Sequence, residues 1–495
     1  MSPTAVHSMK GAKDPPSKLD FTTFHNVING KLVPTKKTRH GINPATLEAL
    51  PEVPVSTPED VDAAMDAGKA AFKLWRNTPW NERSKAVNAF AEALLEHKAE
   101  FAKLLTKEQG KPIPMAENEV DTAYTFLTTF ASLQLQEEVM AEDDKKQTIV
   151  RYTPLGIVVG IVPWNFPIML ACGKLAPALL TGNSIVIKPS PFTPYCDMKL
   201  VELGQRFFPA GVLQILSGDD ELGPWLTAHP APAKISFTGS SATGKKVMES
   251  AAKTLKRVTL ELGGKDPAII CSDVDIASVA PQIATMAFLN SGQVCLAIKR
   301  IYVHAAIYDE FRDAVAAHTR KLVLGNGEAA GVFMGPVQNK MQYEKVSEFF
   351  SDVEARKMKI VAGGEAPPAD PAKQGGYYIK PTIIDAPPDN SRIAMEEPFG
   401  PIVPMMKWDS EEDVIARAND TQMGLGASVW SKDLDQAARI ARQLEAGSVW
   451  VNTHLEVDPM APFGGHKESG VGFEFGLGGL KQFCNTQALY MKKKA

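Results

Sequence analysis

Gly156-Ile157-Val158-Val159-Gly160-Ile161-Val162 is a short apolar run whose length and composition predict a β-strand. Ser184-Ile185-Val186-Ile187-Lys188 and Lys234-Ile235-Ser236-Phe237-Thr238 are similar runs further along the chain, and helical segments separate them. Strands that alternate with helices at this spacing predict a parallel, doubly wound sheet. The predicted fold class is therefore α/β.

The sequence before this run predicts small strands followed by long helices. Asn29-Gly30 lies between the apolar pairs Val27-Ile28 and Leu32-Val33, which predicts a hairpin. Thr57-Pro58-Glu59-Asp60 combines a capping residue, a proline and acids, which predicts the start of a helix. Amphipathic spacing then predicts helices over about 61–75, 82–105 and 117–136, and a further strand over 149–152.

A second alternating set of elements occupies residues 268–451. We expect helices near 307–324 and 411–418, strands near 427–430 and 448–452, and a surface loop over 365–375. The terminal residues 486–491 predict a strand that pairs outside its own domain. Because 495 residues exceed what one hydrophobic core usually organises, two large domains are expected.

Composition excludes several classes of protein. Apolar residues make up 44% and charged residues 22% at a net charge of −4, which disfavours a disordered or a nucleic-acid-binding protein. The five cysteines show neither disulfide nor metal spacing, which indicates a reducing compartment and no metal. Residues 1–20 lack a signal-peptide core, and no run reaches the roughly 18 apolar residues of a membrane helix. We therefore expect a cytoplasmic protein with a flexible tail at 1–20 and no membrane partner.

Two chemically reactive side chains lie near the middle of the chain. Cys295 ends the run Asn290-Ser291-Gly292-Gln293-Val294-Cys295, and Glu261 interrupts the apolar run Val258-Thr259-Leu260-Glu261-Leu262. A thiolate attacks electrophilic carbon and a carboxylate in a partly apolar site can activate water, so together they suit acyl chemistry followed by hydrolysis. The alternatives are a cysteine that serves as a small buried apolar residue and a partly exposed carboxylate on an edge strand.

Two further motifs follow predicted strands directly. In Pro163-Trp164-Asn165-Phe166-Pro167 the Asn165 amide could donate to a developing oxyanion, or it could bond its own backbone in a turn. In Thr238-Gly239-Ser240-Ser241-Ala242-Thr243-Gly244 a glycine turn leads into a helix start whose N–H groups, with the Ser240 hydroxyl, could hold a pyrophosphate. The alternative there is a plain turn between a strand and a helix, since the GxGxxG fingerprint is absent.

These motifs, in this order, resemble the aldehyde dehydrogenase superfamily. The resemblance also includes Lys188-Pro189-Ser190, Glu396-Glu397-Pro398-Phe399-Gly400-Pro401 and Pro462-Phe463-Gly464-Gly465-His466-Lys467-Glu468-Ser469-Gly470, and it extends from about Phe24 to the end. It implies a Rossmann-like cofactor domain over 21–131 and 153–260 and an α/β catalytic domain over 261–463. It further implies a small oligomerisation element over 132–152 and 478–495, in a homodimer or homotetramer.

The resemblance implies roles for individual residues. Cys295 is implied as the nucleophile, which forms a thiohemiacetal and then a thioester, and Asn165 with the Cys295 backbone N–H as the oxyanion donors. Glu261 is implied as the base that activates the hydrolytic water, with Lys174 and Glu474 as its proton relay. The residues implied in binding NAD or NADP are Trp164, Lys188, Ser190, Gly218, Gly239, Ser240, Gly263, Glu397 and Phe399.

The sequence departs from the family at positions that bear on specificity. NAD-preferring relatives often carry Glu three residues after the ribose lysine, where this chain has Pro191, so NADP becomes plausible. Many relatives carry Trp just before the relay lysine, where this chain has Gly173. That glycine predicts a wider apolar channel, unless the loop at 455–458 folds inward and fills it. The predicted substrate pocket comprises Leu170, Gly173, Leu289, Val294, Leu296, Val457 and Phe463.

Together these features predict NAD(P)-dependent oxidation of a bulky apolar or aromatic aldehyde to the carboxylic acid. A CoA-acylating enzyme of the same fold is one alternative, and Glu261 argues against it because such an enzyme needs no hydrolytic base. A non-catalytic protein of the same fold is the other, and it has no chemical need for Cys295, Glu261 and Asn165 together. Phe473 replaces an Arg common in the last motif, and no function is assigned to it.

Overall fold

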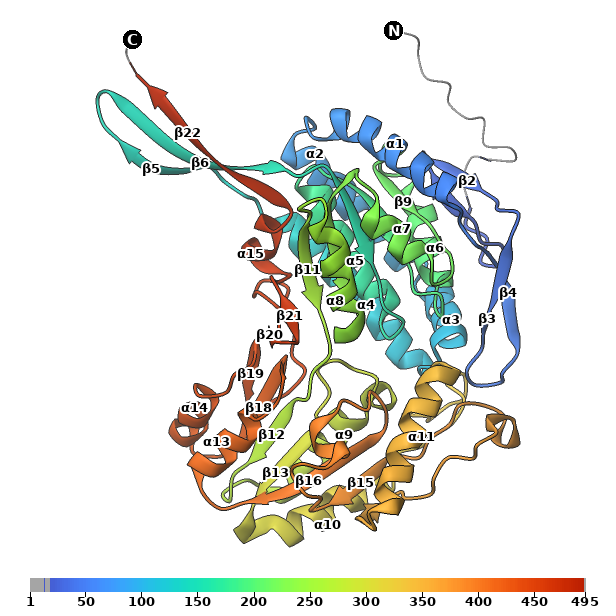
Figure 1. Ribbon diagram of the computed structural model, residues 1–495, viewed down its shortest axis with the longest axis vertical. Helices are drawn as coiled ribbons and strands as arrows, with labels where there is room; N and C mark the ends of the chain where they lie inside the picture. The colour runs from blue at the N-terminus through green and yellow to red at the C-terminus, as the bar shows by residue number, and fades with distance from the viewer. Residues whose placement is uncertain (1–12, 14–17, 494–495) are drawn as a thin grey trace.

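The computed structural model describes residues 13 and 18–493 and has the predicted α/β architecture, arranged as two lobes and a projecting arm (Figure 1). Most of the predicted tail at 1–20 lies outside the described residues. The first lobe is built on an eight-stranded sheet in the order β2-β1-β9-β8-β7-β10-β11-β21. Its strands are β1 (Asn26–Ile28), β2 (Lys31–Val33), β7 (Ile157–Ile161), β8 (Ser184–Lys188), β9 (Leu213–Ile215), β10 (Pro232–Thr238), β11 (Arg257–Glu261) and β21 (Gly470–Val471).

The five central strands of this sheet are parallel, as the sequence predicts, and antiparallel strands close both edges. Every residue of β7 and β8 is buried, because helices cover both faces of the sheet. The predicted hairpin at Asn29-Gly30 joins β1 to β2, and the two glycine-type positive φ angles of these residues make the turn.

Helices pack on both faces of the first sheet. Those of the first lobe are α1 (Pro58–Trp75), α2 (Trp80–Glu96), α3 (Lys98–Gln109), α4 (Ile113–Ser132), α5 (Pro167–Leu180), α6 (Tyr195–Gly204), α7 (Leu222–Ala228) and α8 (Ser241–Ala252). The capping box predicted at Thr57 is present, because Thr57 and Asp60 bond each other's backbone N–H groups.

The prediction of one helix over 82–105 is wrong, because the chain leaves helical geometry at His97 and α2 ends there. The change of direction allows Phe101 and Leu105 of α3 to be fully buried in the core of the first lobe. The amphipathic period runs through the break, so the sequence pattern does not reveal it.

The second lobe contains a seven-stranded sheet in the order β14-β15-β16-β13-β12-β18-β19. Its strands are β12 (Pro267–Ile270), β13 (Arg300–His304), β14 (Lys359–Ala362), β15 (Thr382–Asp385), β16 (Ile402–Trp408), β18 (Gly426–Trp430) and β19 (Ser448–Val451). Its helices are α9 (Ile276–Phe288), α10 (Tyr308–Thr319), α11 (Lys340–Ala355), α12 (Arg392–Met395), α13 (Glu411–Asn419) and α14 (Leu434–Ala441). The helix predicted over 307–324 ends early, at Thr319, because Leu324 leaves it to form a β-bridge with Met334.

The projecting arm consists of β5 (Glu138–Glu142), β6 (Lys146–Pro154) and β22 (Cys484–Lys492). The strand predicted near the C-terminus lies within β22, which pairs along its whole length with β6 and projects with it from the first lobe (Figure 1). Val139, Met140 and Tyr490 expose 55%, 62% and 78% of their surface on this arm.

The other strands and the last α-helix of the described residues are β3 (Thr38–Ile42) with β4 (Ala49–Pro54), β17 (Met423–Gly424) with β20 (His466–Lys467), and α15 (Gly476–Lys481). The chain returns to the first lobe after residue 463: β20 pairs with a strand of the second lobe, and β21 then joins β11 of the first sheet. Residues 464–477, which belong to none of the predicted domains, therefore link the two lobes.

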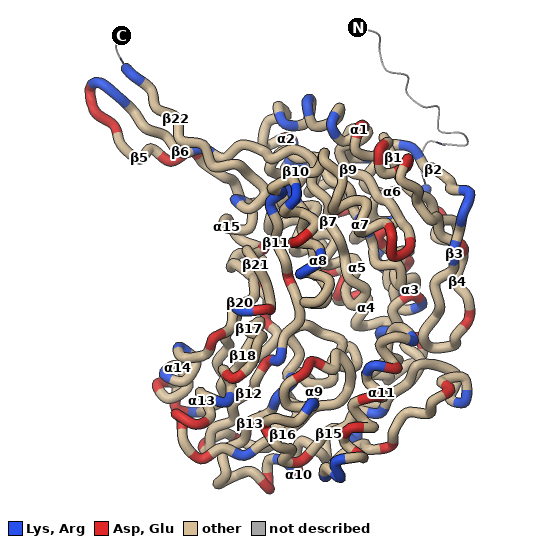
Figure 2. Tube along the Cα trace, in the orientation of Figure 1, with Lys and Arg blue, Asp and Glu red and all other residues tan. Residues whose placement is uncertain are grey.

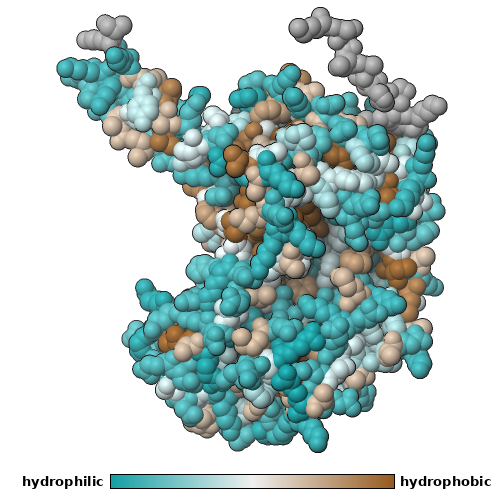
Figure 3. All heavy atoms as spheres, in the orientation of Figure 1, coloured by the Kyte–Doolittle hydropathy of each residue, from teal (hydrophilic) through white to brown (hydrophobic). Residues whose placement is uncertain are grey.

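The surface carries charges of both signs on both lobes (Figure 2). On the face shown in Figure 3, the second lobe is mostly hydrophilic, and apolar side chains reach the surface chiefly in the first lobe and toward the junction of the lobes. Across residues 18–493, no helix combines the length and the apolar character that crossing a bilayer requires.

Candidate active site

A cavity of about 950 Å³ extends from the carboxyl ends of the first sheet's strands to the second lobe. Ile161 ends β7, Lys188 ends β8 and Thr238 ends β10, and all three residues line the cavity. Cys295 and residues of α11, such as Gln342, line it from the second lobe. Open parallel sheets bind ligands at this edge, so the fold places the cavity where a nucleotide would be expected.

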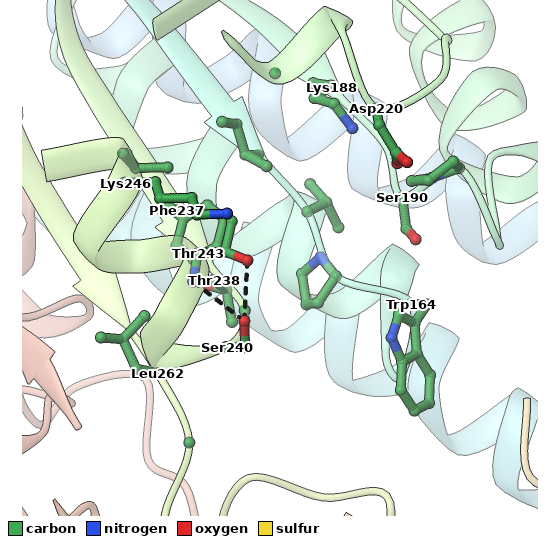
Figure 4. A pocket seen from close by; sticks show the side chains of 18 of the residues that line it. Trp164, Lys188, Ser190, Asp220, Phe237, Thr238, Ser240, Thr243, Lys246 and Leu262 are labelled. Atoms are coloured by element: carbon green, nitrogen blue, oxygen red, sulfur yellow. Dashed lines mark hydrogen bonds between the residues drawn. The ribbon is translucent and has the colours of Figure 1, made fainter. Parts of the chain in front are cut away.

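The start of α8 forms one wall of the cavity (Figure 4). Ser240 is the N-cap of this helix, and its hydroxyl oxygen accepts a hydrogen bond of 3.3 Å from the Thr243 N–H. The other N–H groups of the first turn have no partner within the helix, and the helix dipole adds partial positive charge there. This end of α8 therefore suits an anionic group such as a pyrophosphate.

Lys188, Ser190, Asp220 and Trp164 lie on the opposite side of the cavity in Figure 4. Lys188 is 7% exposed, and burial lowers the pKa of its ammonium to about 8. Its Nζ donates to the Pro189 carbonyl over 3.2 Å. The sequence did not single out Asp220, since a second acid beside Asp219 in an exposed loop carries no signal of its own.

Eight of the nine residues predicted to bind a cofactor line this cavity, and Gly218 does not. Asp220, Gly223 and Pro224, which follow Gly218 in the chain, line it instead. The eight that line it are Trp164, Lys188, Ser190, Gly239, Ser240, Gly263, Glu397 and Phe399.

Glu397 is held firmly at the second lobe's side of the cavity. Its Oε1 accepts a hydrogen bond of 3.1 Å from the Gly264 N–H and lies 3.1 Å from the Lys299 ammonium. A Cβ at Gly263 would lie 2.3 Å from Glu397 Oε2, so only glycine permits this approach. Phe399 contacts Trp164 edge to face, at 5.3 Å between ring centroids, across the cavity.

Cys295 lines the cavity after a tightly constrained turn. Asn290 and Ser291 have φ of 50° and 58°, a region that such residues rarely adopt, and the Ser291 hydroxyl donates to the Gly335 carbonyl over 2.7 Å. Cys295 is partly exposed, but burial of the sulfur raises the thiol pKa to about 12. The unliganded site therefore contains a protonated thiol at neutral pH.

Asn165 lines the same cavity and is 3% exposed. Its Nδ2 donates to the Gln293 carbonyl over 3.1 Å, which leaves one amide hydrogen for another acceptor. Its side chain bonds the segment that carries Cys295, so the alternative of a turn asparagine bonding its own backbone is wrong.

Glu261 ends β11 and is 3% exposed, with no hydrogen-bond partner for either carboxyl oxygen among the described residues. The alternative of a partly exposed edge-strand carboxylate is therefore wrong, since β11 lies between β10 and β21. Burial raises the pKa of Glu261 well above its ordinary value, the Glu474 charge raises it further, and the Lys174 charge opposes both. Glu261 does not itself line the cavity, although the next two residues do.

Lys174 and Glu474 form a buried ion pair, with Lys174 Nζ 2.8 Å from Glu474 Oε1. Lys174 Nζ also donates to Thr238 Oγ1 over 2.7 Å, and Ser236 Oγ donates to Glu474 Oε1 over 2.9 Å. Ser236 and Thr238 were not predicted for this network. Their i, i+2 spacing on β10, the strand that pairs with β11, is the signal that places both on one face.

The predicted widening of the channel at Gly173 is wrong. A Cβ at Gly173 would lie 3.3 Å from Phe475 Cε1, so the ring of Phe475 occupies the space beside this glycine. Phe475 packs against Phe126 at 4.8 Å and stacks on Phe463 at 5.5 Å between ring centroids. Phe475 was not among the predicted residues, because nothing in the local sequence shows that a residue some 300 positions later returns to α5.

The other predicted pocket residues do not line the 950 Å³ cavity, and three of them, Val294, Leu296 and Phe463, pack with Cys295. Val294 and Leu296 belong to a buried apolar cluster against which Cys295, Leu455 and Phe463 pack. Leu455 therefore points inward, which agrees with the alternative that the loop at 455–458 folds into the channel, whereas Val457 remains 38% exposed. Leu170 and Leu289 are partly buried.

Comparison with known proteins gives a consistent result. The model of the aldehyde dehydrogenase family matches residues 33–489. The chain is 43% identical to aldehyde dehydrogenase LUC3 of a Fusarium species, covering 96% of this chain and 100% of that protein. It is 37% identical to phenylacetaldehyde dehydrogenase of Pseudomonas fluorescens, covering 92% of each chain. A crystal structure of betaine aldehyde dehydrogenase from Staphylococcus aureus in complex with NAD+ superposes with a TM-score of 0.92 at 33% identity, covering 96% of each chain.

Proposed function

The chain belongs to the aldehyde dehydrogenase family, and we propose that it oxidises an aldehyde to the carboxylic acid with a nicotinamide dinucleotide as hydride acceptor. The observation that carries this proposal is the convergence of Cys295 and Asn165 on one nucleotide-sized cavity. The start of α8 in the same cavity suits the pyrophosphate of such a cofactor, and the S. aureus relative binds NAD+.

In the proposed mechanism the Cys295 thiol, which its raised pKa keeps protonated at rest, first releases its proton to bulk water. The thiolate sulfur then attacks the aldehyde carbon and forms a thiohemiacetal. The free amide hydrogen of Asn165 stabilises the oxyanion that develops, together with the Cys295 backbone N–H. A bound nicotinamide supplies the acceptor for the hydride that leaves this carbon, so that a Cys295 thioester remains.

Hydrolysis of the thioester requires a base, and we assign that role to Glu261. Its raised pKa means that it must lose a proton before it can activate water. Lys174 and Glu474 lie close enough to act on its charge. Ser236 bonds both of them, and Thr238 bonds Lys174. We propose that this network carries the proton away from Glu261.

We propose an apolar or aromatic aldehyde as the substrate class. The side chains that pack around Cys295 are Val294, Leu296, Ala297, Leu425 and Trp450, with Phe166, Leu455 and Phe463 at their edge. These apolar side chains favour burial of an apolar part of the substrate beside the thiol. Phe475 limits the size of the substrate on the Gly173 side.

For the cofactor, we propose NAD+ in preference to NADP+. Pro191 removes the expected carboxylate, but Asp220 lines the cavity on the same side as Lys188 and its charge acts on that lysine (Figure 4). A carboxylate beside a ribose accepts from its hydroxyl groups and repels a 2′-phosphate. Asp220 would therefore replace the missing acid from a different loop.

We also propose the predicted domain boundaries and a homodimer or homotetramer that forms through the arm. The arm's exposed Val139, Met140 and Tyr490 support this assembly, since apolar groups of this size on a projecting sheet favour a partner. The five cysteines are all free thiols, which supports a reducing compartment such as the cytoplasm.

The test is the initial rate of NADH and NADPH formation with short aliphatic, long aliphatic and aromatic aldehydes. We expect Cys295→Ala to abolish turnover. We expect Glu261→Gln to release about one NADH per site in a burst and then to slow sharply, because the thioester forms but is not hydrolysed. Acid product without added CoA excludes the CoA-acylating alternative. Failure of the unmutated protein to reduce either cofactor with any aldehyde would refute the proposed function.

A further inference from the structure

A buried ion pair between Lys111 and Glu119 lies directly behind Asn165. We propose that this pair positions Asn165 for oxyanion stabilisation, so that Lys111 and Glu119 are positioning residues for the chemical step. The inference rests on the proposed function and goes beyond it, since neither residue belongs to the predicted site or lines the cavity.

Lys111 reaches Asn165 through the backbone. Lys111 Nζ donates to the Asn165 carbonyl oxygen over 2.8 Å and also contacts the Glu119 carboxylate. Both charged side chains are fully buried, and Lys111 Nζ lies 3.8 Å from the centroid of the Phe166 ring. The ammonium therefore contacts both the peptide group that follows Asn165 and the aromatic ring of the next residue, Phe166.

Glu119 fixes the helix that follows Asn165. Its Oε1 accepts hydrogen bonds of 3.0 Å and 3.3 Å from the N–H groups of Ile168 and Met169, in the first turn of α5. Its Oε2 contacts Lys111. One carboxylate on α4 therefore holds both the start of α5 and the lysine that binds Asn165, so the three cannot move independently.

Asn165 is also hydrogen-bonded to the segment that carries Cys295. Asn290 Nδ2 donates to the Asn165 carbonyl over 3.3 Å, and Asn165 Nδ2 donates to the Gln293 carbonyl over 3.1 Å. The Asn165 carbonyl thus accepts from Lys111 in the first lobe and from Asn290 in the second. Loss of the lysine would leave the relative position of Asn165 and the Cys295 segment to the weaker bonds alone.

Energetics argue for a positioning role. Burial lowers the pKa of Lys111 and raises the pKa of Glu119, and the charge of each residue opposes the shift in the other. The ammonium and the carboxylate are therefore stabilised mainly by each other. A buried ion pair is often no more stable than apolar residues of the same shape. What the pair supplies here is a donor aimed at one carbonyl and an acceptor aimed at two amides.

The test is a double-mutant cycle between the ion pair and Asn165. Lys111→Met with Glu119→Gln keeps the shape of both side chains and the carbonyl acceptor for α5, but removes the donor to Asn165. We expect this variant to lose about tenfold in kcat, while its affinity for NADH changes less than about twofold. Asn165→Ala should lose roughly 100-fold or more, as expected for an oxyanion donor. The three substitutions combined should fall less than about twofold below Asn165→Ala, because the pair acts through a side chain already absent.

The Lys199–Glu202 pair is a matched control. It is also buried, with Nζ 2.6 Å from Oε2, and it lies on α6 away from Asn165. Lys199→Met with Glu202→Gln should lower the melting temperature as the test variant does, and leave kcat within about twofold. Where the Lys111 double variant fails to fold, Lys111→Met alone serves, since Glu119 can hold a proton and keep both of its bonds to α5.

Three results would overturn the inference. The first is that Lys111→Met with Glu119→Gln lowers kcat by the same factor in the Asn165→Ala background as in the unmutated protein. The others are that this double variant keeps more than half of the unmutated kcat, or that Lys199→Met with Glu202→Gln lowers kcat as much. Absence of aldehyde oxidation by the unmutated protein would refute the proposed function and this inference with it. Turnover by the unmutated protein with an additive cycle would refute the inference alone.

Discussion

Phe475 fills the space that the sequence assigns to an open channel, and its removal tests that correction. The side chain is 3% exposed and touches three other rings, with centroids at 4.8 Å from Phe126, 5.9 Å from Phe130 and 5.5 Å from Phe463. Its backbone has φ of 64° and ψ of 164°, a region otherwise open only to glycine. The packing of the ring must therefore outweigh a strained backbone.

The magnitude follows from these two terms. Phe475→Ala removes a buried ring and leaves a cavity, which costs about 3–5 kcal/mol of unfolding free energy. In a lobe of this size each 1 kcal/mol shifts the melting temperature by roughly 2–4 °C, so a fall of about 6–20 °C is expected. Phe475→Gly should recover about 1–3 kcal/mol of that loss, because glycine adopts this backbone conformation without strain.

Differential scanning calorimetry gives the first measurement, and kcat/KM across aldehydes of increasing size gives the second. Phe475→Ala should shift the preference toward larger aldehydes, because the new space adjoins Gly173 and Phe463. Phe130→Ala is the matched control: it removes another buried ring of the cluster, but one that does not touch Gly173. If Phe475→Ala lowered the melting temperature by less than about 2 °C and left the size preference unchanged, Gly173 would face open space after all.

Three other predictions follow from single contacts. Asp220→Asn should lower the ratio of kcat/KM for NAD+ to kcat/KM for NADP+ by roughly tenfold, since one charge near a 2′-phosphate is worth about 1 kcal/mol or more. Asp219→Asn is the control, because the Asp219 carboxylate pairs with Lys37 at 2.8 Å. Equal ratios in the two variants would contradict the role of Asp220. Buried His454 donates a hydrogen bond of 2.7 Å from Nε2 to the Leu296 carbonyl, and burial lowers the pKa of its imidazole to about 3. Below about pH 6.5 the unfolded chain therefore binds a proton at this residue that the native chain does not bind. Stability should therefore fall as the pH drops from about 6.5 toward 3, by at most about 1.4 kcal/mol per pH unit from this group, and His454→Phe should make the decline of the melting temperature measurably shallower. Gly263→Ala would place a Cβ 2.3 Å from Glu397 Oε2 and displace that carboxylate from the Gly264 N–H. The Kd for NADH, measured by fluorescence, should therefore rise roughly tenfold. An unchanged Kd would show that Glu397 does not contact the cofactor.

The sequence predicts the first sheet well because its strands are short apolar runs separated by clear helical spacing. β7, β8 and β10 lie within one or two residues of their predicted positions, and the Ser240 turn begins α8 as expected. The break at His97 is not visible in the sequence, because the apolar period continues through it while tertiary packing redirects α3. Local pattern therefore predicts which elements form more reliably than where each one turns.

In the candidate site, too, the sequence predicts individual residues better than the contacts around them. Cys295, Asn165 and Glu261 were found from residue type and motif, but their surroundings depend on contacts between distant parts of the chain. Lys111 binds the Asn165 carbonyl from 54 positions away, and Phe475 reaches Gly173 from the far end of the sequence.

The return of the chain after residue 463 explains why the substrate side of the site was the hardest part to predict. Phe463 and Glu474 bond each other's backbone as an isolated antiparallel bridge, and β21 between them joins β11 next to Glu261. One short segment therefore delivers Glu474 to the ion pair with Lys174 and Phe475 to the wall beside Gly173. Glu474 is in the bridge and its side chain enters the proton network, whereas Phe475 is at the bend before α15 and its ring enters the aromatic cluster. A substitution that shifts this segment should consequently change thioester hydrolysis and aldehyde size preference together, whereas Phe475→Ala, which leaves the backbone bridge intact, should change the size preference alone.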